Sequence, residues 1–149
     1  MPATLASPLA RKPFPASPTF AQMRPWDHGA VPRSVLVVDD DDCFRDLVAR
    51  LLSGWGHSVI AEATTVHEAL ERAVELRPDA ALVDIGLPDG DGFELTRQLR
   101  AMSWPVRVVL ISSAADGANV PAARRAGACA FLPKEELSGL ELRRLLDEG

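Results

Sequence analysis

Five short apolar runs, four of which end in polar residues, constrain the fold of this 149-residue chain more than any other feature. The runs are rich in Val, Ile, Leu and Ala, which is typical of strands buried on both faces of a sheet. They are residues 35–38, 57–61, 80–84, 106–112 and 130–132. Stretches with helical apolar spacing follow the first three runs and the last. A weaker stretch of small residues, 113–127, follows the fourth and predicts only a short or loose helix.

The helical stretches carry apolar residues at intervals of three and four, which predicts one buried face on each helix. Leu47 and Val74 are among the residues expected on these buried faces. Thr65 and Glu68 have capping-box spacing, and a second capping box is expected to begin at Ser138. Strand and helix therefore alternate as five βα units. This favours an α/β fold with a doubly wound five-stranded parallel sheet, flavodoxin-like strand order 2-1-3-4-5 and helices on both faces.

Composition divides the chain into a tail and one domain. Residues 1–33 contain seven of the twelve prolines and no sustained period, which predicts a disordered Pro-rich tail ahead of a domain at 34–149. The tail has a net charge of +3 and the remainder −8, and such an acidic body argues against direct nucleic-acid binding. No apolar run approaches the roughly 18–20 residues of a membrane span. Cys43 and Cys129 show no metal-ligand spacing and suggest no disulfide framework, which favours the reducing cytoplasm. We therefore expect a cytoplasmic chain and, without a membrane span, no membrane partner.

Polar residues at the strand ends carry the chemistry. Asp39 and Asp40 follow the first run, Asp84 ends the third, Ser112 ends the fourth and Lys134 follows the fifth. Ligands of doubly wound sheets bind at this edge, where the first and third strands are neighbours. Three carboxylates there repel one another unless a cation lies among them, and oxygen ligands favour Mg²⁺, with Mn²⁺ possible. Between a metal and Lys134, the carboxylate of Asp84 could attack a phosphoryl group, which Ser112 could hydrogen-bond.

Four motifs at these strand ends resemble the receiver domain of bacterial two-component response regulators. They are VVDD (37–40), LVDIGLPDGDG (82–92), LISS (110–113) and FLPK (131–134). The resemblance covers about residues 34–149 and implies transfer of a phosphoryl group from a histidine kinase or phosphotransfer protein to Asp84. It also implies Mg²⁺ held by Asp39, Asp40, Asp84 and the backbone carbonyl of Gly86.

The same resemblance implies a conformational switch. Ser112 corresponds to the switch hydroxyl, Phe131 to the rotating aromatic residue and Lys134 to the phosphate-binding lysine. The face made by the fourth helix, fifth strand and fifth helix is expected to bind an unknown downstream protein or to form a dimer. Lys134 is followed by Glu135 and not by the proline common in the family, as in receivers that precede LuxR-type helix-turn-helix domains. Because too few residues follow the last expected helix for a helix-turn-helix domain, the chain is expected to be a stand-alone switch, with no enzymatic activity beyond its own phosphorylation and dephosphorylation.

Other interpretations remain open at this stage. Asp41 or Asp42 can be a plain helix cap, and His57 is interpreted as a packing or surface residue without a partner. A phosphorylation-independent adaptor and a truncated transcriptional regulator would both keep the same fold. A phosphatase resembling haloacid dehalogenases could use the acids at 39–41, but this would leave Asp84 unexplained.

Overall fold

The computed structural model describes residues 32–113, 119–137 and 140–147. Its main sheet has five parallel strands in the order β3-β2-β4-β7-β8. The strands are β2 (Ser34–Val38), β3 (Ser58–Ala63), β4 (Ala80–Asp84), β7 (Arg107–Ser112) and β8 (Ala130–Pro133). Numbered along the chain, this is the order 2-1-3-4-5, so the predicted fold class is confirmed.

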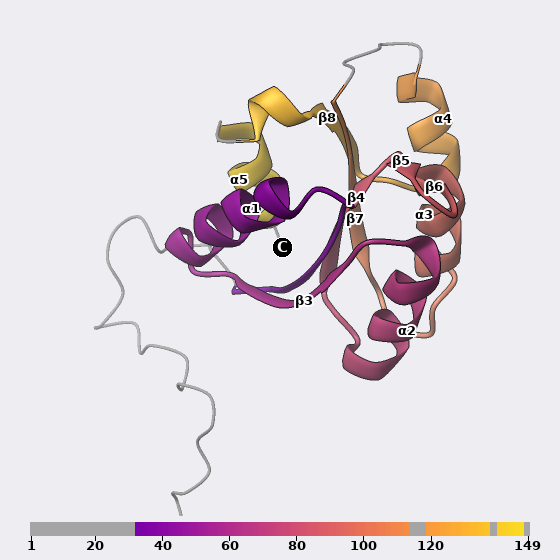
Figure 1. Cartoon of the computed structure of the whole chain (residues 1–149), viewed down its shortest axis with the longest axis horizontal. Coiled ribbons are helices and arrows are strands. Elements are labelled where there is room, and N and C mark those ends of the chain that lie inside the picture. The colour runs from indigo at the N-terminus through magenta and orange to yellow at the C-terminus, as the bar shows by residue number, and fades with distance from the viewer. Residues whose placement is uncertain (1–31, 114–118, 138–139, 148–149) are drawn as a thin grey trace, which may run out of the picture. The chain divides into compact units, whose positions relative to one another are not determined.

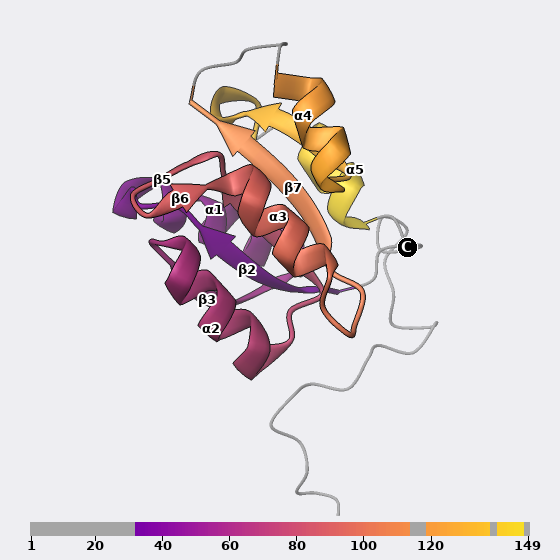
Figure 2. The same ribbon diagram turned by 90° about the vertical axis from the view of Figure 1, so that its right-hand side faces the viewer.

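Helices cover both faces of the sheet (Figure 1 and Figure 2). On one face lie α1 (Asp42–Gly54) and α5 (Leu140–Asp147), and on the other α2 (Val66–Leu76), α3 (Gly92–Arg100) and α4 (Asn119–Ala126). Successive strand residues point to opposite faces, so Val35 and Leu82 pack under α1 and α5, whereas Leu36 and Val83 pack under the other three. No helix within the described ranges is long and apolar enough to cross a membrane.

Side-chain caps determine where three of the helices begin. Asp41, Thr65 and Asp91 accept backbone N–H bonds in the first turns of α1, α2 and α3. The predicted capping box of α2 forms only in part, because Glu68 accepts the amide of Thr64, at 2.8 Å, where a capping box would use that of Thr65. The second predicted box, at residues 138–139, lies outside the described residues.

Two residues predicted to be buried are exposed. Leu47 of α1 is 45% exposed and Val74 of α2 is 65% exposed, so the predicted stripes were too wide. Each stands next to a buried residue, Val48 and Ala73, and one position along a helix rotates a side chain by about 100°. Because α1 and α2 each rest on the sheet along a narrow line of residues, that rotation turns Leu47 and Val74 away from it.

The end of α5 is tied to the amino-terminal edge of the sheet. His57 is buried; its Nδ1 accepts the amide of Arg33 at 3.0 Å, and its Nε2 lies 2.8 Å from Oδ1 of Asp147. The guanidinium groups of Arg33 and Arg107 donate to backbone carbonyls in the last turn of α5. The expectation that His57 lacks a partner is therefore wrong, and Arg33, assigned to the tail from its composition, contacts the domain.

Two short elements were not predicted. Residues 86–91 form a two-stranded antiparallel hairpin of β5 (Gly86–Leu87) and β6 (Gly90–Asp91), and β8 is followed by a 3₁₀ turn, η4 (Lys134–Glu136). Strands of two residues are too short to show a period. The weak stretch 113–127 does contain a short helix, the eight-residue α4, while residues 114–118 lie outside the described ranges.

Candidate functional site

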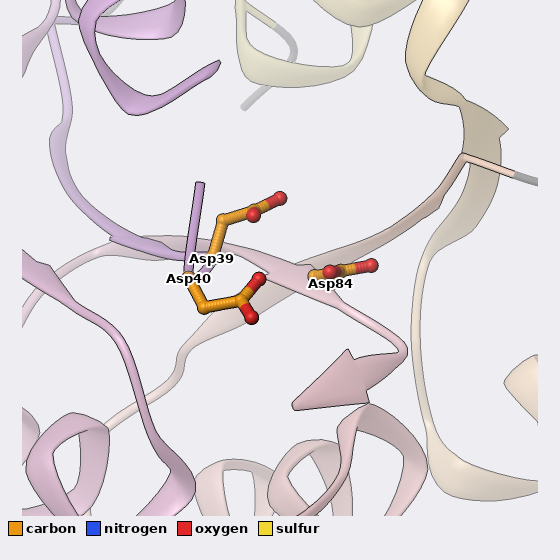
Figure 3. A group of neighbouring side chains, drawn as sticks. All are labelled: Asp39, Asp40 and Asp84. Carbon is orange, nitrogen blue, oxygen red and sulfur yellow. The ribbon is translucent and has the colours of Figure 1, made fainter. Parts of the chain in front are cut away.

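Three carboxylates converge where β2 and β4 end side by side. Val38 pairs with Val83 in the parallel register, so the next residues, Asp39 and Asp84, meet at the carboxyl edge of the sheet. Oxygens of Asp39, Asp40 and Asp84 all lie within 4.8 Å of one another (Figure 3). Asp39 and Asp84 are buried, whereas Asp40 is exposed.

Asp39 is held by hydrogen bonds at three of its four polar atoms. Its amide donates to the carbonyl of Ala63 at 3.0 Å, its Oδ1 accepts the amide of Asp41 at 2.9 Å, and its carbonyl accepts Nη1 of Arg45 at 2.6 Å. The fourth atom, Oδ2, is buried and accepts no hydrogen bond of good geometry from the described residues. It lies 2.6 Å from Nζ of Lys134, which supplies charge without a well-directed hydrogen bond. A buried oxygen in this condition is suited to bind a cation.

Lys134 reaches the carboxylates from the end of β8. Its Nζ lies 2.6 Å from Oδ2 of Asp39 and 3.8 Å from Oδ2 of Asp84. The same ammonium lies 4.3 Å from the ring centroid of Phe44 on α1, a cation–π contact that holds the lysine over the site. Three carboxylates face one ammonium, which leaves the cluster with excess negative charge.

The remaining site residues predicted from the sequence lie around this cluster. Asp84 pairs with Ile111 of β7, so Ser112, which is buried, stands one residue beyond it at the same edge. The amide of Gly86 lies 3.5 Å from Oδ1 of Asp84. Phe131 is half-buried on β8 and lines a cavity of about 220 Å³ next to α4.

The pKa of Asp84 lies above its ordinary value of 3.8. Burial is the main cause, the negative charge of Asp39 adds to it, and Lys134 and the Gly86 amide act in the opposite direction. The folded protein therefore carries a penalty for keeping Asp84 ionised. A divalent cation would remove that penalty, and the three carboxylates are the hard oxygen donors that Mg²⁺ prefers.

This penalty predicts that Asp84→Asn stabilises the protein in metal-free buffer at neutral pH. A raised pKa in the folded state means that stability falls as the pH rises through it, so the penalty is absent below pH 3.8 and complete above the raised pKa. Each unit by which the pKa is raised corresponds to about 1.4 kcal/mol of gain in the variant. Urea unfolding of both proteins at low and neutral pH measures it. Equal stability at neutral pH would show that burial does not penalise this carboxylate.

The loop after Asp84 is anchored to a neighbouring helix. The carboxylate of Asp89, in the β5–β6 turn, accepts the backbone amides of Val66 and His67 at 2.7 and 3.0 Å. Asp89 thus caps α2 from outside that helix, beside the cap made by Thr65. These two hydrogen bonds lower the pKa of Asp89.

We expect Asp89→Ala to speed hydrogen exchange at the amides of Val66 and His67, because both lose their acceptor. The amide of Glu68, which is bonded to Thr65, should change little and serves as the internal control. Asp89→Asn keeps an acceptor oxygen, so its exchange rates at Val66 and His67 should lie between those of the wild type and of Asp89→Ala. Unchanged exchange in Asp89→Ala would mean that the loop is held by other contacts.

Two contributors to the site carried no signal in the sequence. Phe44 is buried on the apolar face of α1, and its contact with Lys134 joins positions that only the folded sheet brings together. Arg45 lies on the polar side of the same helical stretch, where a solvent-exposed side chain is the ordinary expectation. The structure places it against the backbone of Asp39 instead.

The fold and the acidic pocket define a class: flavodoxin-like domains with clustered carboxylates at the carboxyl edge of the sheet. Residues 35–146 match the family model described as the response regulator receiver domain, and the chain belongs to this family. The resemblance inferred from the motifs is therefore confirmed. Receiver domains serve phosphorelay signalling, bind Mg²⁺ through an acidic pocket, and interact with histidine kinases or phosphotransfer proteins.

The relatives include regulators of different lengths. The KDP operon transcriptional regulatory protein KdpE of Escherichia coli is 39% identical over 101 residues, covering 68% of this chain and 44% of KdpE. The chemotaxis protein CheY of Thermotoga maritima is 30% identical over 102 residues, covering 68% of this chain and 85% of CheY. The chain thus spans about half the length of relatives such as KdpE and DevR/DosR of Mycobacterium tuberculosis, of which it covers 52%.

Solved structures agree with this assignment. The receiver domain of the NarL response regulator from Mycobacterium tuberculosis has a TM-score of 0.68 and 34% identity, covering 76% of this chain and 96% of that one. A response regulator from Burkholderia pseudomallei, solved with a phosphorylated aspartic acid, a calcium ion and citrate, has a TM-score of 0.69 and 27% identity. That match covers 76% of this chain and 66% of the other.

Proposed function

We propose that this chain is a phosphorylation-controlled switch whose phosphoacceptor is Asp84. The observation that carries the proposal is the cluster of Asp39, Asp40 and Asp84 within 4.8 Å, with Lys134 against two of its members. The phosphorylated aspartic acid of the Burkholderia pseudomallei regulator supports it by analogy. Asp39, Asp40, Asp84 and the carbonyl of Gly86 would hold Mg²⁺.

The reaction is a phosphoryl transfer from a phosphohistidine of a sensor kinase or phosphotransfer protein. An Asp84 oxygen forms a new P–O bond as the P–N bond breaks, and the released imidazole takes up a proton from solvent. When bound, Mg²⁺ supplies positive charge beside the transferred group. Lys134 neutralises the phosphoryl oxygens from the other side, and Ser112 donates a hydrogen bond to them. Water later hydrolyses the acyl phosphate, so the chain acts as a carrier and not as a turnover enzyme.

The output is a change of the face formed by α4, β8 and α5. Engagement of Ser112 by the phosphoryl group leaves room beside it, and Phe131 turns inward. The cavity of about 220 Å³ between Phe131 and α4 supports this step, because it gives both elements room to repack. A protein partner or a second copy of the chain then binds the altered face.

A second candidate is favoured by the lengths of the relatives. KdpE and DevR/DosR are named as regulators of transcription, and the chain spans 44% and 52% of them. The same switch would then act inside a longer regulator and control a DNA-binding part. The mass of the native protein, detected in cell extract with an antibody to this domain, separates a stand-alone switch from a longer regulator.

The proposal is tested by incubating the protein with acetyl phosphate and Mg²⁺ and measuring its intact mass. We expect one phosphoryl group per chain, and no adduct when EDTA removes the metal. Amide signals of residues 119–137 should shift in the presence of beryllofluoride, a phosphoryl mimic. A protein that gains no phosphoryl group under these conditions would overturn the proposal.

A further inference from the structure

Arg45 joins three segments around the metal-site carboxylates. Its Nη1 donates to the carbonyl of Asp39 at 2.6 Å, its Nε donates to Oε1 of Glu62 at 2.9 Å, and its Nη2 donates to Asp42. These acceptors belong to the end of β2, the edge strand β3 and the start of α1. Only 12% of the arginine side chain is exposed.

The planar guanidinium suits this position better than any other cation. It offers five N–H donors in a fixed geometry, so one group can serve three acceptors that point in different directions. An arginine is charged at every physiological pH, and two of its three acceptors here are carboxylates, so its bonds to Glu62 and Asp42 are charge-assisted.

The hydrogen bond from Arg45 to the Asp39 carbonyl restrains the orientation of the peptide that joins Asp39 to Asp40. The amide of Asp39 is fixed on β3 and its Oδ1 on the Asp41 amide, and Arg45 adds a restraint on the carbonyl of the same residue. The restrained peptide joins Asp39 to Asp40. Its orientation influences the direction in which the Asp40 carboxylate leaves the chain, while the Oδ1 bond to the Asp41 amide leaves Oδ2 of Asp39 facing Lys134.

We propose that Arg45 is a positioning residue: it holds the Asp39–Asp40 peptide in the orientation that makes the carboxylates converge on a cation. This inference rests on the proposed function, because the cation is the Mg²⁺ of the phosphoryl-transfer site. The charge of Arg45 and its positioning role have opposite effects on the affinity of the site for Mg²⁺. Removing a nearby positive charge strengthens the binding of another cation, whereas releasing the peptide weakens it.

The test is the Mg²⁺ dissociation constant of Arg45→Gln, obtained by titrating amide chemical shifts. We expect binding to weaken by about tenfold, since loss of a group that orients a metal ligand typically costs 10–100-fold in affinity. Arg45→Lys keeps the charge but cannot reach three acceptors, so it should also bind Mg²⁺ more weakly. Arg50→Gln removes the same charge from an exposed arginine on α1 and should leave binding unchanged or slightly stronger. Binding by Arg45→Gln at or above the wild-type affinity overturns the inference.

A second readout needs no metal. In metal-free buffer, hydrogen exchange of the Asp41 amide, which is bonded to Oδ1 of Asp39, should be faster in both Arg45 variants than in Arg50→Gln.

Glu62→Gln should weaken Mg²⁺ binding when Arg45 is present and have no further effect in Arg45→Gln, because Glu62 acts through the arginine. Wild-type protein that binds no Mg²⁺ would contradict the proposed function, and the exchange rates would then decide the role of Arg45 alone.

Discussion

Replacing Asp84 by asparagine is expected to abolish the phosphoryl adduct formed with acetyl phosphate and Mg²⁺. Asparagine has nearly the same shape and keeps an oxygen that can accept the Gly86 amide, but its amide is not a nucleophile toward phosphorus. The loss should therefore be chemical and not structural. Intact mass measures the adduct, and thermal unfolding verifies that the variant folds.

Asp89→Asn is the matched control for this experiment. Asp89 lies in the same loop and loses the same charge, yet it caps α2 and does not belong to the carboxylate cluster. Its variant should still accept one phosphoryl group. An adduct of equal yield on Asp84→Asn would mean that another residue is the acceptor, and fragmentation of the modified peptide would identify it.

The sheet and the position of the acids were predictable because both depend on local pattern. Continuous apolar runs identify strands buried on two faces, and parallel strands bring their carboxyl ends to one edge. Asp39 and Asp84 are 45 positions apart in the sequence, yet strand order alone predicts that they meet. Neither conclusion needs side-chain detail.

Side-chain contacts between distant elements could not be predicted in this way. The contact of Phe44 with Lys134, the pairing of His57 with Asp147 and the clamp of Arg45 on Asp39 all depend on distances set by the packed sheet. Apolar period also overestimated the buried faces of α1 and α2. The apolar period of a helix shows which residues are suited to burial. The width of the contact between helix and sheet decides which of them are buried.

Gly92, the first residue of α3, lies against the backbone that carries Asp84. A Cβ on Gly92 would stand 2.5 Å from the carbonyl oxygen of Asp84 and 2.8 Å from Cα of Ile85. The helix start cannot move away freely, because the Gly92 amide donates to the carbonyl of Ile85 at 2.9 Å and the Gly92 carbonyl accepts the hydroxyl of Thr96 at 2.7 Å. The clashing atoms are backbone, so no change of rotamer relieves them.

We therefore expect Gly92→Ala to lower the free energy of unfolding by about 2 kcal/mol, within the range of about 1–3 kcal/mol typical of overpacking. The higher helix propensity of alanine offsets part of the clash and is included in this value. The displaced Asp84–Ile85 peptide should also slow phosphorylation by acetyl phosphate. Urea unfolding and the rate of adduct formation measure the two effects.

Gly86→Ala is the matched control, because the same methyl group on the same loop would meet no atom within 4 Å. Its stability should stay within about 0.5 kcal/mol of the wild type. It should also be phosphorylated normally, since the atom proposed to bind Mg²⁺ is a backbone carbonyl that alanine retains. Wild-type stability in Gly92→Ala would show that α3 can shift without cost. If that variant kept wild-type stability but was phosphorylated slowly, the methyl group would act by changing the orientation of the Asp84 carboxylate and not by destabilising the fold.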